Sequence, residues 1–355
     1  MILKHIFFIV LASCSEVFSQ LRTCQDCQEI QQCPRAVELA SKMDNKAMQV
    51  VRGALCGFDD SGLPKVCCSD FTSPEDKELD RHPNLALLPE KCGKMDPNRI
   101  IGGTVAGLYE FPWMVLIGFD TRLGLRFGCG GSLINENYVL TAAHCVKNKK
   151  IAGIRVGEHT TNTSTDCIGV APKRDCEDYL QDRRIDKELV HEEYDPATGR
   201  NDIALLRVKR PIRFSDEIKN AGTICLPVNS SHRARNLANE TAIVAGWGVT
   251  EERQASTMLL KVNVPVYGKQ ECRNFYNKNT DIVNDNNICA GEVGRDSCKG
   301  DSGGPLMLEG TYNNLKRFIQ YGLVSFGPKK CGLAYPGVYT DVSKYMKWIL
   351  DNIEA

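Results

Sequence analysis

The sequence contains 17 cysteines, and this number constrains the fold more than any other feature of the chain. Cytosolic proteins keep their thiols reduced, so many cysteines without a metal-cluster pattern predict an oxidising compartment and a framework of disulfides. An odd total requires that one cysteine is removed or stays free. Which cysteine this is can be answered from the N-terminal segment.

Residues 1–19 have the pattern of a secretory signal peptide. A basic stretch precedes an apolar run over 6–12 that is too short to span a bilayer, and a cleavage site lies before Gln20. A buried N-terminal strand is the alternative interpretation. Removal of the segment would remove Cys14 and leave sixteen cysteines, an even number. We therefore expect a secreted, extracellular protein, and no other apolar run is long enough to hold it in a membrane.

Six cysteines fall within residues 24–68, a segment too short to bury a large core, so disulfides must stabilise it. One or two short helices are expected there, over 36–40 and 48–51. Residues 69–99 are expected to be a linker, because this stretch is polar and contains four prolines that favour extended conformations.

The remaining residues, 100–355, are long enough for one large β domain, and a chain of 355 residues is expected to form about two domains. Short β-rich runs separated by Gly, Asn and Pro predict a sandwich or a barrel. These runs cover residues 113–119, 131–135, 138–142, 203–208, 241–246, 306–308 and 322–326. An amphipathic stretch over 343–353 predicts a C-terminal helix. The 44 basic residues equal the 44 acidic ones, which argues against a nucleic-acid-binding protein.

Three short motifs supply the groups that nucleophilic catalysis requires. A serine hydroxyl is a weak nucleophile that needs a base within hydrogen-bond reach and a third group to orient that base. The segment TAAHC contains the candidate base His144, and NDIALL contains the carboxylate Asp202 at the start of a predicted strand. The segment GDSGGP contains the candidate nucleophile Ser302 among glycines that permit a tight turn.

These motifs, in the order His, Asp, Ser, resemble those of the chymotrypsin-like serine proteases over all of residues 100–355. The resemblance implies a mostly β fold, with a two-β-barrel trypsin-like protease domain beside a small disulfide-rich N-terminal domain. It also implies that Ser302 attacks the scissile carbonyl, that His144 transfers the proton and that Asp202 orients the imidazole. The N–H groups of Gly300 and Ser302 would form the oxyanion hole.

The same resemblance predicts the substrate preference. Asp296, six residues before the candidate nucleophile, matches the carboxylate at the base of the trypsin primary pocket. Ser325, Gly327 and Gly337 match positions that line this pocket and leave it open. An open pocket that ends in an anion favours Arg or Lys, because a buried unpaired charge would reject an apolar side chain. Phe326 replaces the more usual tryptophan, and we expect a modest effect on the neighbouring subsite.

Residues 99–103, with the sequence RIIGG, resemble the activation site of the family. Cleavage after Arg99 would free the amino group of Ile100, which would then pair with Asp301 and shape both the pocket and the oxyanion hole. Because a free α-amino group titrates near pH ~8, we expect activity to fall at alkaline pH. A flat profile would contradict this expectation. The arginine also implies that the activating enzyme has trypsin-like specificity.

The resemblance further implies disulfide pairs in the protease domain, which are Cys129–Cys145, Cys272–Cys289 and Cys298–Cys331. Cys167 and Cys176 lie in one loop and are expected to pair with each other. Cys225 then has Cys92 as its expected partner, and this bridge would keep residues 20–99 attached after cleavage. Spacing alone does not determine connectivity.

The six-cysteine segment resembles the clip domain of arthropod serine proteases, on CGFD at 56–59 and VCC at 66–68. The family pattern implies the pairs Cys24–Cys67, Cys27–Cys56 and Cys33–Cys68. A disulfide-rich spacer without a binding role is the alternative for this segment.

Two further kinds of site are expected in the protease domain. Glu158 lies where some relatives bind calcium through a loop, and Asp166, Glu177 and Asp178 could add oxygen ligands. Catalysis itself is expected to require no cofactor. Asn162, Asn229 and Asn239 each begin an Asn-x-Ser/Thr glycosylation motif.

The sequence therefore predicts a secreted clip-domain serine endopeptidase zymogen that cleaves proteins after Arg or Lys in an extracellular cascade. By resemblance the cascade serves innate immunity, either prophenoloxidase activation (melanization) or the Toll pathway, with a developmental or venom protease as the alternative. The expected partners are downstream zymogens, an upstream trypsin-like activator and a serpin-type inhibitor. Binding to nucleic acid or to a membrane is not expected. A non-catalytic homologue acting as a scaffold is a further alternative, although such relatives usually replace the nucleophile, and here the serine is present.

Overall fold

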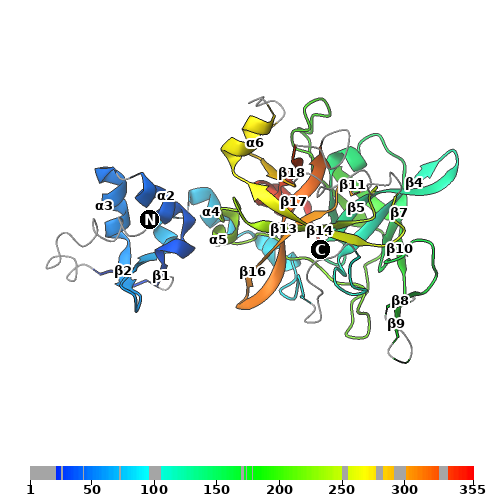
Figure 1. Cartoon of the computed structure of the whole chain (residues 1–355), viewed down its shortest axis with the longest axis horizontal. Coiled ribbons are helices and arrows are strands. Elements are labelled where there is room, and N and C mark those ends of the chain that lie inside the picture. Colours follow the sequence, from blue (N-terminus) through cyan, green and yellow to red (C-terminus); the bar gives the residue numbers. More distant parts are fainter. Residues whose placement is uncertain are drawn as a thin grey trace. The chain divides into compact units, whose positions relative to one another are not determined.

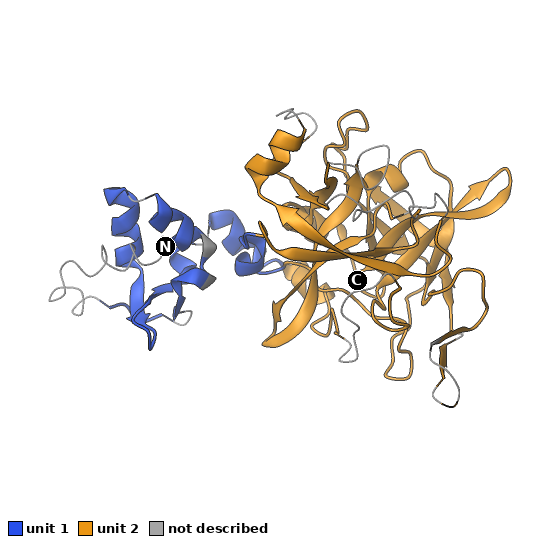
Figure 2. Ribbon diagram, in the orientation of Figure 1, with its two compact units in different colours: residues 1–82, 228–236 blue, residues 83–227, 237–355 orange. Residues whose placement is uncertain are grey.

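The structure is a computed structural model that contains two compact units (Figure 2). Unit 1 comprises residues 1–82 and 228–236, and unit 2 comprises residues 83–227 and 237–355. The structure describes residues 21–24, 27–42, 44–71, 73–95, 105–168, 172, 174–177, 179–249, 255–276, 283–291, 301–327 and 335–355. The predicted signal peptide lies outside these residues. None of the helices in the described part has both the length and the apolar character needed to cross a membrane.

Unit 1 contains a small antiparallel sheet, in the order β1 (Cys27–Glu29), β3 (Pro64–Cys67), β2 (Leu55–Phe58). Two helices, α2 (Pro34–Ser41) and α3 (Asn45–Gly53), confirm the short helices expected in this segment. Asp44 caps α3, because its side chain accepts a hydrogen bond from the Ala47 N–H at 2.7 Å. The core contains only small and medium side chains with one phenylalanine, namely Ile30, Cys33, Ala36, Ala40, Met48, Val51, Ala54, Leu55, Val66 and Phe71.

The linker is not the extended segment that its prolines predicted. It forms helix α4 (Pro74–Leu79), with a 3₁₀ turn (Pro83–Leu87) after it. Ser73 caps α4 by accepting the Asp76 N–H, and Pro74 occupies the first turn, where a missing N–H costs nothing. The expectation was wrong because proline stops a helix from within but starts one readily.

Helix α4 is anchored inside unit 1 by a buried arginine. Arg233 ends the short helix α5 (Ser230–Arg233), and its guanidinium lies 3.0 Å from Asp76 and 2.8 Å from Asp80. Burial opposes the charge of Asp76, yet hydrogen bonds from Ser73 and Arg233 hold the pKa of Asp76 below its usual value. Asp76 therefore stays ionised against the cation at neutral pH.

The first half of unit 2, called the sheet half below, is one seven-stranded sheet (Figure 1). Its order is β10 (Gln181–Arg183), β7 (Ile151–Val156), β4 (Met114–Thr121), β5 (Gly124–Leu133), β6 (Tyr138–Thr141), β12 (Ala204–Val208), β11 (Ile185–Val190). The sheet curls so that β11 approaches β7. A separate pair of short strands, β8 (Asp166–Ile168) and β9 (Asp175–Glu177), forms a hairpin beside it.

The second half, called the barrel half below, is a closed six-stranded barrel. Its order is β13 (Thr241–Gly246), β14 (Leu260–Tyr267), β15 (Asn287–Ala290), β18 (Gly337–Asp341), β17 (Leu315–Phe326), β16 (Pro305–Tyr312). Helix α6 (Lys269–Phe275) follows β14. The predicted C-terminal helix is α7 (Met346–Asn352), which begins after a 3₁₀ turn (Val342–Tyr345). The mostly β, two-barrel prediction is confirmed.

The two halves pack through side chains from both. Trp113 and Phe318 lie edge to face at 5.8 Å between ring centroids, and the Trp113 indole N–H lies 3.2 Å from the Met307 sulfur. Between β5 and β17, the buried Ser132 hydroxyl donates to Gln320 at 2.6 Å. These contacts hold the strand ends of both halves in fixed positions, which is where the candidate site lies.

Seven disulfides are present among the described residues, each joining a pair that the resemblance or the spacing implied. They are Cys24–Cys67, Cys27–Cys56, Cys33–Cys68, Cys92–Cys225, Cys129–Cys145, Cys167–Cys176 and Cys272–Cys289. The eighth expected pair, Cys298–Cys331, lies outside the described residues. The Cys92–Cys225 bond joins residues on either side of Arg99, so a cut there would leave both pieces covalently linked.

Candidate active site

His144 and Asp202 meet at the ends of two adjacent strands of the sheet half. His144 lies in the 3₁₀ turn (Ala143–Cys145) that follows β6, and Asp202 directly precedes the segment leading into β12. The His144 Nδ1 lies 2.8 Å from Asp202 Oδ2, and the His144 backbone N–H donates to Oδ1 at 2.9 Å. Asp202 has 3% of its side chain exposed and His144 has 31%. The carboxylate therefore holds one edge of the imidazole, while the other edge remains accessible.

The barrel half supplies two further partners to the same aspartate. The Ser325 hydroxyl donates to Asp202 Oδ2 at 2.5 Å, and the Thr340 hydroxyl donates to the Asp202 backbone carbonyl at 2.9 Å. A buried carboxylate needs such donors, because an unpaired charge away from water is costly. With the His144 Nδ1–H also directed at the carboxylate, the opposite ring nitrogen, Nε2, is left as the basic position.

Ser302 is brought to this pair by its backbone. The Gly130 N–H of β5 donates to the Ser302 carbonyl at 2.8 Å. The next residue, Gly303, has φ +77°, and a Cβ there would lie 2.2 Å from Thr141 Oγ1, three residues before His144. The Cys145 sulfur lies 3.6 Å from both the His144 Nε2 and the Ser302 carbonyl oxygen. The serine turn thus packs directly against the segment that carries the imidazole.

Asp301, the predicted partner of the new N-terminus, lies in a cradle made by two glycines. Its Oδ1 accepts the Gly248 N–H at 2.8 Å. A Cβ on Gly246 would lie 2.0 Å from Asp301 Oδ1, and one on Gly248 would lie 2.2 Å from Oδ2. The carboxyl group can occupy this position only because both residues lack side chains. Arg99 and Ile100, its predicted activators, lie outside the described residues.

The predicted primary pocket is described only in part. Gly337 begins β18 and is buried, Gly327 follows β17 and is exposed, and Phe326 packs its ring against Gly199, where a Cβ would come within 2.9 Å. Asp296 and the oxyanion residue Gly300 lie outside the described residues. Ser325 was expected at the pocket, and its hydroxyl also contacts Asp202, a contact that spacing along the chain does not reveal.

Comparison with known proteins identifies the family. A model of the Trypsin family matches residues 100–349, and a model of the Regulatory CLIP domain of proteinases matches residues 26–68. The chain belongs to the CLIP-domain, trypsin-like serine proteases. The expected resemblance to clip-domain proteases is therefore confirmed.

Similar CLIP-domain proteases span almost the whole chain. CLIP domain-containing serine protease HP8 of Bombyx mori is 38% identical over 366 residues, covering 98% of this chain and 96% of that protein. Melanization protease 1 of Drosophila melanogaster is 33% identical over 402 residues, covering 99% of both. The solved structure of the Drosophila Grass clip serine protease of the Toll pathway is 32% identical, with a TM-score of 0.66, and covers 92% of this chain and 93% of that chain.

A residue of this CLIP-domain protease that sequence patterns missed is Tyr345. Its hydroxyl donates to Asn201 Oδ1 at 2.8 Å, and Asn201, with φ +55°, sets the turn immediately before Asp202. Burial raises the pKa of Tyr345 to about 12, so the hydroxyl keeps its proton for this bond. The tyrosine positions the carboxylate through its neighbour and does not touch the imidazole. An aromatic residue in the predicted C-terminal helix usually indicates core packing, so the sequence carried no signal for this role.

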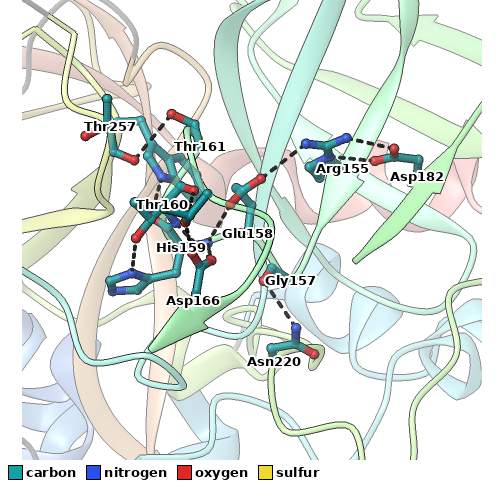
Figure 3. A network of polar contacts seen from close by, with 12 residues as sticks. Arg155, Gly157, Glu158, His159, Thr160, Thr161, Asp166, Asp182, Asn220 and Thr257 are labelled. Atoms are coloured by element: carbon teal, nitrogen blue, oxygen red, sulfur yellow. Dashed lines mark hydrogen bonds and ion pairs between the residues drawn. The ribbon is translucent and has the colours of Figure 1, made fainter. Parts of the chain in front are cut away.

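The predicted calcium loop forms a buried polar network (Figure 3). The Glu158 side chain is 1% exposed, lies 3.3 Å from the Arg155 guanidinium and accepts the His159 N–H at 3.2 Å. The same N–H lies 3.0 Å from Asp166 Oδ2, which brings the two carboxylates together. Burial and then the charge of Asp166 raise the pKa of Glu158, and the Arg155 charge only partly offsets this. Two buried carboxylates sharing one donor are the hard oxygen ligands that a calcium ion prefers.

The other two residues expected at this loop are Glu177 and Asp178. Glu177 accepts the Tyr179 N–H at 2.8 Å, and Asp178 lies outside the described residues. Of the expected ligands, the structure brings Glu158 and Asp166 together. The three predicted glycosylation asparagines, Asn162, Asn229 and Asn239, are all exposed.

Proposed function

We propose that this chain is the zymogen of a secreted serine endopeptidase that cleaves protein substrates after Arg or Lys. The observation that carries the proposal is the 2.8 Å contact between His144 Nδ1 and Asp202 Oδ2, with the Ser302 turn hydrogen-bonded to Gly130 beside it. A base held by a buried carboxylate next to a serine on a glycine-rich turn suits acyl transfer.

In this mechanism the Ser302 hydroxyl attacks the scissile carbonyl while His144 Nε2 accepts its proton. The resulting imidazolium is stabilised by the Asp202 carboxylate, whose orientation is maintained by Ser325. His144 then returns the proton to the leaving amine, and a water molecule repeats the cycle on the acyl-enzyme. The Ser302 N–H and the predicted donor Gly300 would stabilise the oxyanion, where one donor contributes roughly 10²–10³ in rate.

Latency would arise at Asp301. We expect cleavage after Arg99 to supply an ammonium group from Ile100 that neutralises the carboxylate in the Gly246–Gly248 cradle. An upstream protease of trypsin-like specificity would make this cut, and a serpin-type inhibitor would end the activity. The light chain would stay attached through Cys92–Cys225.

Two relatives support our proposal of a cascade role. Melanization and the Toll pathway appear in the names of two similar proteins, which share the CLIP and protease regions with this chain. We therefore place the protease in an extracellular immune cascade, with other zymogens as substrates. The exposed Asn162, Asn229 and Asn239 are proposed as glycan acceptors of the secreted form.

The test uses full-length recombinant zymogen cut at Arg99 by immobilised trypsin, which is then removed. The cut protein should hydrolyse an Arg-amide chromogenic substrate, whereas uncut protein and cut Ser302→Ala should not. A cut protein without turnover would refute the proposal and favour the scaffold alternative. Incubation with candidate plasma zymogens, followed by sequencing of new termini, would identify the substrate.

We further propose that Glu158 and Asp166 hold a structural calcium ion, which would stabilise the loop without taking part in catalysis. The support is the shared His159 N–H and the excess of negative charge at the two buried carboxylates. A ligand at a hundred times its dissociation constant stabilises the folded state by about 2.7 kcal/mol, or roughly 5–10 °C in Tm for a domain of this size.

The prediction is that calcium raises Tm by this amount relative to EGTA, measured by differential scanning fluorimetry at constant ionic strength. Glu158→Gln should abolish the shift, and Glu188→Gln, outside the loop, should preserve it. A calcium-independent Tm in the parent protein, or an equal shift in Glu158→Gln, would contradict the calcium site while leaving the catalytic proposal intact.

A further inference from the structure

The hairpin between β4 and β5 ends in exposed apolar side chains. Leu123 is 80% exposed and Leu125 is 58% exposed, the two highest values among the large hydrophobic residues of the described chain. Figure 1 shows this hairpin extending outward at the edge of unit 2. Adjacent exposed leucines are unfavourable in water, and apolar patches rimmed by polar residues mark interaction sites.

Cations flank these leucines. The side chains of Arg122 and Arg126 are exposed and make no hydrogen bond or ion pair with any residue that the structure describes. The single acid of the hairpin, Asp120, is already paired with Lys150 at 2.8 Å. The tip therefore combines a net positive charge with exposed apolar side chains. Its complement is a segment that combines acidic and apolar side chains.

The tip is connected to the active site by one strand. β5 runs from Gly124 to Leu133, and its Gly130 N–H donates to the Ser302 carbonyl. Gly130 lies six residues after Gly124, which corresponds to about 20 Å of strand. An extended peptide covers the same distance in about six residues.

The direction in which a bound substrate would run follows from the two strands that flank the Ser302 turn. On one flank the Gly303 N–H donates to Val324 of β17, whose end carries the predicted pocket residues Ser325 and Gly327. The opposite flank is β5. A substrate with its arginine in the pocket would therefore send the residues after the cleaved bond toward β5 and the hairpin tip.

We propose that Arg122, Leu123, Leu125 and Arg126 form a docking surface for an acidic–apolar segment of the protein substrate, beginning about six residues after the cleaved bond. The inference rests on the proposed function and specifies its substrate class. The surface would select among proteins that all offer an arginine to the pocket, a choice that the pocket alone cannot make.

The test compares internally quenched peptides that share the residues around the cleaved arginine. One carries alternating Glu and Leu from about the sixth to the ninth residue after the bond, and the second carries Lys and Ser there. A third carries the Glu–Leu segment before the arginine. With cut protein, the first peptide should show about tenfold higher kcat/KM than the others, an advantage that shrinks as salt rises.

Two variants separate the surface from the active site. Arg122→Glu/Arg126→Glu and Leu123→Ser/Leu125→Ser should remove the advantage of the first peptide while hydrolysing the Arg-amide substrate like the parent. The matched control is the β16–β17 hairpin, whose Leu315 is 54% exposed and which Figure 1 shows on the opposite side of unit 2. Leu315→Ser/Lys316→Glu should retain the full advantage.

Binding measurements keep this test independent of turnover. Fluorescence anisotropy of the labelled first peptide with cut Ser302→Ala should show tighter binding than the second peptide by the same factor. Equal binding of the two peptides, or an equal loss in the Leu315→Ser/Lys316→Glu variant, overturns the docking surface. Absence of turnover with retained selective binding would overturn the catalytic proposal alone.

Discussion

The two halves of unit 2 position their catalytic groups by opposite means. In the sheet half, His144 and Asp202 are held by hydrogen bonds that their own atoms make, at 2.8 and 2.9 Å. In the barrel half, the Asp301–Ser302 turn also accepts hydrogen bonds, but it fits only where side chains are absent. A Cβ on Gly246, Gly248 or Gly303 would fill the space that the turn needs. The base is fixed by hydrogen bonds of its own residue, whereas the turn that carries the nucleophile also requires neighbouring glycines.

This difference indicates where regulation can enter. A histidine–aspartate pair made of direct bonds can be complete before and after activation. The Asp301–Ser302 turn instead requires that the Asp301 carboxylate lies between the two glycines. The position of this carboxylate can depend on a cation supplied from elsewhere. The sheet half therefore supplies constant chemistry, and the barrel half supplies the part that cleavage would control.

The largest expected effect is on the pair itself. His144→Ala should lower kcat of the cut protein by about 10⁵-fold or more, as should Ser302→Ala, because the base and the nucleophile act as one unit. The double variant should be no worse than either single variant. Initial rates with the Arg-amide substrate measure this, and additive losses would show that the two halves do not act together.

The second effect tests the glycine cradle. Gly248→Ala would place a methyl group 2.2 Å from Asp301 Oδ2, so the carboxyl group must leave the cradle. We expect the cut enzyme to lose about a hundredfold in kcat/KM, comparable to losing an oxyanion donor, while its fold is retained. Gly268→Ala is the matched control in the same half, since its nearest neighbour is 3.8 Å away. Full activity in Gly248→Ala would mean that the cradle is not required.

Much of this site could be predicted from the sequence because its motifs are local. The short segments around His144, Asp202 and Ser302 each carry a catalytic residue with its turn, and the structure brings the three segments together. The Ser325–Asp202 bond could not be predicted, since it joins residues 123 positions apart that only the packing of the two halves brings into contact.

The first and last residues of strands and helices were harder to predict from the sequence, for physical reasons. The run over 131–135 was expected to be a strand, whereas β5 begins at Gly124 and ends at Leu133. Its glycines at 124, 128, 130 and 131 have weak strand propensity, and pairing with β4 overrides it. The exposed hairpin tip was therefore missed. Similarly, the prolines of the linker concealed the well-capped helix α4.

A smaller effect is expected where the barrel half supports the sheet half. Ser325→Ala removes one donor to Asp202 but leaves both contacts with His144. We expect roughly a tenfold fall in kcat with KM nearly unchanged, because a hydrogen bond to a charged group contributes about 1.5–3 kcal/mol. Steady-state kinetics on the cut enzyme separate the two constants. A change confined to KM would instead assign the Ser325 side chain to the substrate pocket.

The smallest effect on activity is expected at the contact that only joins the halves. Ser132→Ala leaves the buried Gln320 carbonyl without its donor, so stability should fall by about 1–3 kcal/mol. Activity at room temperature should not change, since neither residue contacts the catalytic groups. Urea unfolding followed by tryptophan fluorescence measures the loss. A large decrease in kcat would show that the packing between the halves sets the catalytic geometry more tightly than we infer.

The central claim is that one serine, activated by a base from the other half, becomes reactive only after cleavage. A fluorophosphonate probe tests it directly, because the probe modifies a serine only when a working base and oxyanion site surround it. Mass spectrometry should find the label on Ser302 in cut protein and on no residue in uncut protein or in cut His144→Ala. Label on another residue, or equal labelling of Ser302 before cleavage, would contradict the account.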